Sequence, residues 1–224
     1  MKTKLLIFLI LTSFEVIGST PQIPDKLIYQ GAEYEWNGYS PAVDYFEKKY
    51  FKAPKEAIET TANYGIFIFT YSIEQDCLYL TDVKILVSIG KDDGPPELGD
   101  KSVFKLYFPN TDKVLMKNYS GLQVTPYGDQ ISQIRKERTF LYYKNYFVFD
   151  IEKGVVNIKL DLNLREYQKL IKDQFEKRKN SPEYIQLAKR NRQNLIYFNE
   201  SREEKFTMDE YLEMNILDNI NHLQ

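Results

Sequence analysis

Alternation between apolar and polar positions is clearest in residues 64–87. The first half of this segment has a large apolar or aromatic residue at every second position: Phe67, Phe69, Tyr71 and Ile73. This spacing puts the four side chains on one face of a β-strand, and we expect that face to be buried. Polar residues 74–76 interrupt the pattern, and alternation resumes up to residue 87. The segment therefore predicts a β-hairpin.

A second hairpin is predicted between residues 139 and 160. Residues 139–151 are rich in aromatic and apolar side chains, with one polar break at Lys144-Asn145. Glu152-Lys153-Gly154 has the composition of a tight turn. Apolar residues then alternate with polar ones, at Val156, Ile158 and Leu160. The pattern predicts a further antiparallel strand pair.

The N-terminal part of the chain predicts a small hairpin and a short helix. Apolar-rich runs at 26–29 and 32–36 flank Gln30-Gly31, where glycine can supply the positive φ of a tight turn. Ser40-Pro41 places an N-cap residue before a proline, which is typical of a helix start. Apolar residues then recur at helical spacing, so we expect an amphipathic helix at 41–51.

Glycine and proline predict where the middle of the chain forms loops. Residues 89–101 have the composition of a loop and carry four acidic residues: Asp92, Asp93, Glu97 and Asp100. A calcium site is not expected there, because Gly94-Pro95-Pro96 breaks the alternating ligand spacing of an EF-hand. Residues 114–124 predict strand structure that is interrupted at Ser120-Gly121 and ended by Pro126-Tyr127-Gly128.

From Leu162 onward the apolar spacing becomes helical. Ser181-Pro182 predicts the start of one helix, and Thr207 and Glu210 have the spacing of a capping box at the start of another. A narrow apolar stripe follows the capping box: Tyr211, Leu212, Ile216, Ile220 and Leu223. A short isolated helix is marginal in water, so we expect it to pack on the protein's own domain, or else on a partner.

The N-terminus has the three-part pattern of a secretory signal peptide. Lys2 and Lys4 precede an unbroken apolar run at residues 5–11, and small residues follow at 18–20. The run is about half of the roughly 20 residues that a membrane-spanning helix needs. Glu15 is unusual near a cleavage site and leaves a buried strand or a retained anchor as alternatives. We expect an exported protein, periplasmic or secreted, with no stable membrane span after cleavage.

These elements predict an α+β fold with a largely antiparallel sheet built from hairpins, a short N-terminal helix and a helical C-terminal extension. The predicted organisation is a signal peptide at 1–18, an α+β domain at 19–161, and a helical extension at 162–224 packed on that domain. Without regular alternation of strands and helices, a parallel sheet is not favoured.

Composition mainly excludes classes of function. A net charge of −2 gives no electrostatic basis for binding nucleic acid. Cys77 is the one cysteine, which excludes an intrachain disulfide. A catalytic thiol needs a cation beside it, and the sequence places none next to Cys77. His222 is the one histidine, which argues against a histidine zinc cluster or a Ser-His-Asp triad. We expect no cofactor and no metal.

Several short blocks resemble a family of uncharacterised proteins, mostly from Bacteroidetes-type bacteria. They occur in order along residues 25–150: 25–31 with Glu33-Tyr34; 45–48, 61–65 and 75–80; and 108–110, 119–122 and 126–128. The resemblance implies no activity, because that family has no assigned function. The segment after residue 162 lies outside these blocks, so the resemblance implies nothing there.

Two sets of residues are candidates for chemistry or binding. Four carboxylates in or near the resembling blocks, which could form an acid pair for glycoside hydrolysis, are Glu33, Glu35, Asp44 and Glu47. Asn118, Tyr119 and Tyr127 belong to clusters of aromatic and turn residues. Tyrosine suits sugar or protein contacts because its ring is apolar and its tip is polar. These three residues are the best candidates for a binding surface, although tyrosines that cap a core would give the same pattern.

The leading functional hypothesis is a non-enzymatic exported protein that binds a protein or glycan of the bacterial envelope. The alternative is a carboxylate-based hydrolase acting on glycans, which a convergent pair of buried acids in a deep cleft would favour. A partner-dependent inhibitor or immunity-type protein is a third class, and the sequence does not separate it from the first.

The first prediction concerns export. Val16 and Gly18 occupy the small-residue positions before the expected cleavage site. N-terminal sequencing of the protein from its native envelope should therefore begin near Ser19. A mature, correctly located protein that still carries Met1 would contradict this prediction.

Overall fold

The computed structural model describes residues 22–61, 65–90, 97–200 and 203–224. The expected signal peptide and the acidic residues Asp92 and Asp93 lie outside these ranges. The elements in chain order are β1 Asp25–Tyr29, β2 Ala32–Trp36, α1 Pro41–Lys48, β3 Phe67–Glu74, β4 Cys77–Ser88, β5 Leu98–Ser102, α2 Phe104–Tyr107, β6 Val114–Leu115, β7 Gly121–Arg135, β8 Arg138–Glu152, β9 Val155–Asn163, α3 Leu164–Arg178, α4 Pro182–Arg190, α5 Arg192–Phe198, α6 Met208–Met214 and α7 Ile216–Asn219.

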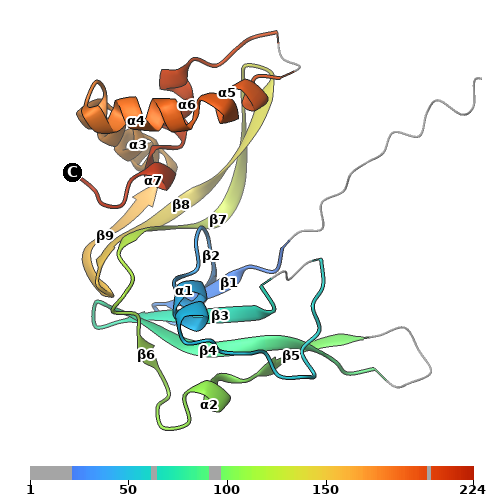
Figure 1. Cartoon of the computed structure of the whole chain (residues 1–224). Helices are drawn as coiled ribbons and strands as arrows, with labels where there is room; N and C mark the ends of the chain where they lie inside the picture. The colour runs from blue at the N-terminus through green and yellow to red at the C-terminus, as the bar shows by residue number, and fades with distance from the viewer. Residues whose placement is uncertain (1–21, 62–64, 91–96, 201–202) are drawn as a thin grey trace, which may run out of the picture.

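The described strands form one sheet in the order β2-β1-β3-β4-β9-β8-β7, with β5 and β6 also paired to β4. Every pairing among them is antiparallel except that of β1 with β3. The sheet curls until its end strands meet, and the rings of Tyr34 on β2 and Tyr127 on β7 lie 5.9 Å apart. Helices α3–α7 gather beside the far ends of β7, β8 and β9 (Figure 1). The predicted α+β class and largely antiparallel sheet are confirmed.

Two-residue turns set the register of the hairpins. Both residues have positive φ in each such turn of the described chain: Gln30-Gly31, Gln75-Asp76, Lys136-Glu137 and Lys153-Gly154. Such turns match the twist of the strands they join. The predicted hairpins β1–β2, β3–β4 and β8–β9 are confirmed. The sequence did not predict the longest hairpin, β7–β8, because Lys136-Glu137 carries neither glycine nor asparagine.

Three expectations about the middle of the chain were wrong. Pro126-Tyr127-Gly128 does not end a strand but lies within β7, where the register shifts between Tyr127 and Gln130. This β-bulge absorbs extra residues, and Gly128 takes the positive φ of +80°. Opposite it, β8 runs unbroken through Lys144-Asn145. Within the expected loop at 89–101, residues 98–102 form β5, because the edge of β4 supplies backbone hydrogen-bonding partners.

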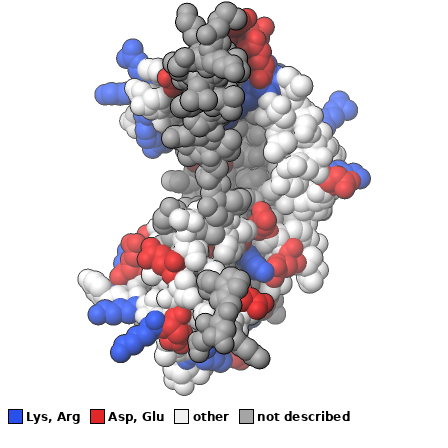
Figure 2. All heavy atoms as spheres, turned by 90° about the vertical axis from the view of Figure 1, so that its right-hand side faces the viewer, with Lys and Arg blue, Asp and Glu red and all other residues white. Residues whose placement is uncertain are grey.

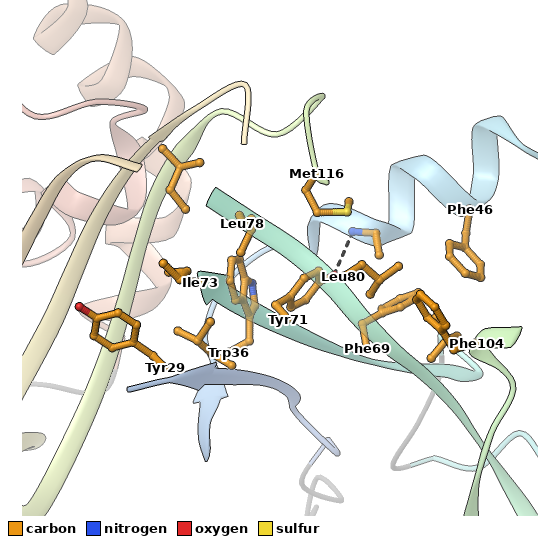
Figure 3. Close-up of a cluster of buried hydrophobic side chains, with 14 of the residues drawn as sticks. Tyr29, Trp36, Phe46, Phe69, Tyr71, Ile73, Leu78, Leu80, Phe104 and Met116 are labelled. Atoms are coloured by element: carbon orange, nitrogen blue, oxygen red, sulfur yellow. Dashed lines mark hydrogen bonds between the residues drawn. The ribbon is translucent and has the colours of Figure 1, made fainter. Parts of the chain in front are cut away.

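The larger core fills the curled sheet and is closed by α1 and α2. Phe46 of α1 packs edge-on against Phe69 of β3, with ring centroids 5.1 Å apart (Figure 3). Tyr71 is fully buried, and its hydroxyl accepts a 3.0 Å hydrogen bond from the Ala42 backbone N–H. That bond fixes the start of α1 to the sheet.

The face of β3 that carries Phe69, Tyr71 and Ile73 is buried in this core, as expected. The opposite face is covered too, because Ile68 is only 4% exposed. A strand covered on both sides explains why its apolar run is nearly continuous in the sequence.

A second core lies on the other side of β7 and β8. It joins Phe175 of α3 and Leu187 of α4 to Leu212, Ile216, Leu217 and Ile220, and Leu122 and Val124 of β7 pack against it. The predicted capping box of Thr207 and Glu210 is present at the start of α6, and Ser181 caps the predicted helix start at α4. The single C-terminal helix that the apolar stripe suggested is interrupted, because the Asn215 side chain donates to the Tyr211 carbonyl and α6 ends there.

The last residues of the chain are held by buried polar groups. Asp150 of β8 is 4% exposed and accepts hydrogen bonds from the Leu223 N–H at 2.8 Å and the His222 ring at 2.6 Å. Arg178 of α3 donates to the His222 carbonyl at 2.7 Å. The C-terminal segment therefore docks on both β8 and α3. Of the helices described, none is long and apolar enough to cross a membrane.

The fold gives a direct test of the larger core. Phe69→Ala should lower the free energy of unfolding by about 3–5 kcal/mol, because it leaves a cavity among packed aromatic rings. Chemical denaturation measures the change. Leu106→Ala, at an exposed position of α2, is the control and should cost less than about 0.5 kcal/mol. Equal stability of the two variants would show that Phe69 does not support the core.

Candidate functional site

A cleft of about 740 Å³ lies where the two cores diverge. One wall is the β7–β8 hairpin, and another is formed by α3 with the α6–α7 segment. The loops at 37–39 and 119–121 close one end. Its volume falls in the range of about 300–1,000 Å³ typical of small-molecule sites. The cleft is thus built from segments that are far apart in the sequence.

Tyrosine side chains dominate the lining of the cleft: Tyr39, Tyr119, Tyr142, Tyr143, Tyr146 and Tyr167. The rings of Tyr146 and Tyr167 stack with centroids 3.7 Å apart and planes inclined by 6°. The Tyr146 hydroxyl accepts a 2.8 Å hydrogen bond from the Tyr143 backbone N–H. This contact and the stack hold the aromatic wall where β8 meets α3.

Five tyrosines of the cleft have raised pKa values, so their phenols are uncharged at neutral pH. Burial raises the pKa of Tyr119 to about 12 and raises the pKa values of Tyr142, Tyr146 and Tyr167 as well. For Tyr39, a hydrogen bond to Asp44 is the main cause of a pKa of about 12. Each hydroxyl therefore keeps its proton and can both donate and accept.

Charged groups lie on both walls of the cleft, on α6 and α7 and on β7. Glu213 and Asp218 supply carboxylates, and Arg135 of β7 supplies a cation. Arg135 is 3.9 Å from Glu210, which also pairs with Lys136 at 2.6 Å. Desolvation in the wall raises the pKa of Asp218. No hydrogen-bond partner for the Asp218 side chain occurs among the described residues, and the residue is exposed to solvent.

The structure places the three residues expected to bind in different surroundings. Tyr119 lines the cleft, and its ring also contacts Trp36, with centroids 6.0 Å apart. Asn118 is exposed outside the cleft lining. Tyr127 stacks on Phe147 with ring centroids 4.3 Å apart, and its hydroxyl bonds to Asp161. Tyr127 thus belongs to the larger core, while its neighbour Pro126 lines the cleft.

The four carboxylates considered for hydrolysis do not converge. All are exposed, and none lines the cleft. Glu33 pairs with Lys26 at 2.7 Å, and Asp44 accepts from Tyr39. Over the described ranges, no group of three or more His, Cys, Asp or Glu residues is placed to hold a metal. His222 is engaged by Asp150 and lies far along the chain from the half-buried Cys77.

Sequence reasoning missed most of the cleft. Tyr142, Tyr143 and Tyr146 belong to a run that was interpreted as a strand, and nothing in that run shows which side faces a cavity. Tyr167 and Asp218 lie in the segment after residue 162, where the sequence predicted helices but no site. The one signal available was the density of tyrosine in residues 139–146.

Charges on the face shown in Figure 2 are of both signs in the upper and the lower half of the view. This mixture gives no broad field of one sign on that face. Comparison with known proteins adds no assignment, because no family model, curated protein or solved structure matches the chain.

The raised pKa of Asp218 yields a pH-dependent prediction. Below about pH 3.8 the carboxyl is protonated in both the folded and unfolded states and costs nothing. As pH rises through the higher folded-state pKa, ionisation of the partly desolvated carboxyl lowers stability. Asp218→Asn should therefore raise the melting temperature at pH 7, and the gain should disappear near pH 3.

Thermal melts across this pH range test the prediction. Asp129→Asn, on the exposed bulge of β7, is the charge-matched control and should change stability by less than about 0.5 kcal/mol. A destabilised Asp218→Asn variant at pH 7 would show that the carboxylate has a stabilising partner.

Proposed function

We propose that this chain is an exported, non-enzymatic binding protein of the bacterial envelope, periplasmic or secreted, and that the tyrosine-lined cleft is its ligand site. Export is supported by the basic and apolar N-terminal pattern. In this proposal the short helix at 41–48 and the helical segment after residue 162 form the scaffold around the site. The ligand is a protein or glycan of the envelope.

The observation that carries the proposal is a set of polar groups left without partners in a concave aromatic site. Within the described part of the chain, the hydroxyls of the half-buried Tyr142, Tyr143 and Tyr167 make no hydrogen bond, and the carboxylate of the exposed Asp218 beside them makes none either. Buried or half-buried polar groups are normally paired, since each unpaired one costs free energy. Exceptions that converge on one cleft are what a ligand site requires.

The second candidate is a glycan hydrolase, favoured by the raised pKa of Asp218, which suits a general acid. A non-enzymatic binding role accounts for the site better than hydrolysis does. In a catalytic pair, each carboxylate raises the pKa of the other through its charge. Burial is the cause of the raised pKa of Asp218, with no contribution from another described carboxylate. An inhibitor or immunity-type role would use the same cleft to bind a protein partner.

Blocking the cleft tests the proposed function. Leu141 lines the cleft and is 58% exposed, whereas Leu106 is 63% exposed on α2, outside it. Leu141→Trp should fill the cleft with little loss of stability, and Leu106→Trp is the matched control. The wild type and the control should gain melting temperature in a solubilised envelope extract, and Leu141→Trp should not. Equal gains for all three proteins would contradict a ligand site in this cleft.

A further inference from the structure

The cleft is lined by more neutral hydrogen-bonding side chains than charged ones. Three kinds of uncommitted group line it: the phenols of Tyr142, Tyr143 and Tyr167, the carboxamides of Asn37 and Asn221, and the carboxylates of Glu213 and Asp218. None of these side chains bonds to another described residue. Apolar surface from Leu141, Met214 and Leu217 lies among them. Asn37, Asn221 and Asp218 are exposed to solvent, whereas the three phenols and Glu213 are half-buried. A ligand in the cleft would therefore meet dispersed polar groups together with aromatic and aliphatic surface.

We propose that the cleft binds a neutral oligosaccharide, with the C–H faces of its sugar rings on the tyrosine rings and its hydroxyls donating to Asp218 and Glu213. This inference rests on the proposed function and names the ligand class of the same site. Aromatic rings present a flat apolar face with a polar edge, which matches a pyranose ring. Sugar hydroxyls can donate and accept at once, as phenols and carboxamides do.

The charges of the cleft select among sugars. Hydrogen bonds from a neutral hydroxyl to a carboxylate are charge-assisted and roughly twice as strong as neutral ones. They would satisfy Asp218 without introducing a second charge. An acidic sugar would bring its carboxylate toward Glu213 and Asp218 and be repelled. Arg135 offsets little of this repulsion, because its own charge is already close to the carboxylate of Glu210.

A peptide ligand fits the cleft less well. Peptides that bind beside a sheet commonly extend it, which requires a free strand edge with regular N–H and C=O groups. The part of β7 along the cleft lacks that regularity. Pro126 has no N–H to donate, and the bulge between Tyr127 and Gln130 breaks the spacing of the ladder. Without backbone pairing, a peptide would leave the uncommitted phenols only partly satisfied.

Titration calorimetry of the full mature chain tests this ligand class. The probes are a panel of neutral α- and β-linked hexose and N-acetylhexosamine oligomers of one to six units, a matched uronic-acid series, and a pool of random hexapeptides. At least one neutral oligomer should bind, and the uronic-acid oligomer of the same linkage should bind about tenfold more weakly or not at all.

Cleft variants locate the binding. Asp218→Asn and Tyr167→Ala should each weaken the neutral oligomer by about tenfold or more, since each removes a strong hydrogen bond or a stacking surface. Asp129→Asn on the bulge and Tyr197→Ala, 64% exposed on α5, are controls and should bind like the wild type. Since Tyr167 supports the stack with Tyr146, Tyr167→Phe provides a variant that keeps the ring while removing the hydroxyl.

The outcomes separate this inference from the proposed function. Binding of hexapeptides but of no neutral oligomer, abolished by Leu141→Trp, overturns the sugar assignment and leaves the cleft as a binding site. Failure of every neutral oligomer to bind overturns the assignment too. Oligosaccharide binding that is unchanged by Leu141→Trp and by Asp218→Asn overturns both the sugar assignment and the proposal that this cleft is the ligand site, because the sugar would then bind elsewhere.

Discussion

Burial of β8 on both faces is the constraint on which the rest of the structure depends. From Tyr146 to Ile151 every side chain is buried. Phe147, Phe149 and Ile151 fill the larger core, while Tyr146 and Asp150 face the helices. Burying each large apolar side chain contributes about 1.5–3 kcal/mol, so this short segment ties the two halves of the molecule together. Because side chains alternate along a strand, neither half can shift its register without exposing the other's core.

The cleft lies where β8 is no longer buried on both faces. Beyond Tyr146 towards the Lys136-Glu137 turn, β7 and β8 extend past the larger core while α3 and α6 lie beside one face. Tyr142 and Tyr143 stand in this region, half-buried, because no described element covers them fully. The bulge in β7 increases the local bend of the hairpin. The aromatic wall thus forms where β7 and β8 extend beyond the larger core that they close.

Sequence patterns correctly predicted the turns and helix caps that depend only on residues close together in the chain. Gln30-Gly31 and Lys153-Gly154 predicted turns because glycine tolerates positive φ, and Thr207 with Glu210 predicted a capping box because both partners lie within one turn. The patterns failed where tertiary contacts decide. Pro126-Tyr127-Gly128 has turn composition, yet pairing with β8 draws it into a strand. Asp218 meets Tyr167 only after α7 docks on α3, and no sequence spacing carries that contact.

The C-terminal segment couples the cleft to the fold. Ile220 and Asn221 line the cleft, and the next residues, His222 and Leu223, are held by Asp150. The contacts that dock this tail therefore also hold one wall of the cleft in place. A hydrogen bond to a buried carboxylate such as that of Asp150 contributes about 1.5–3 kcal/mol, so the bonds that hold the tail also stabilise the cleft wall formed by Ile220 and Asn221.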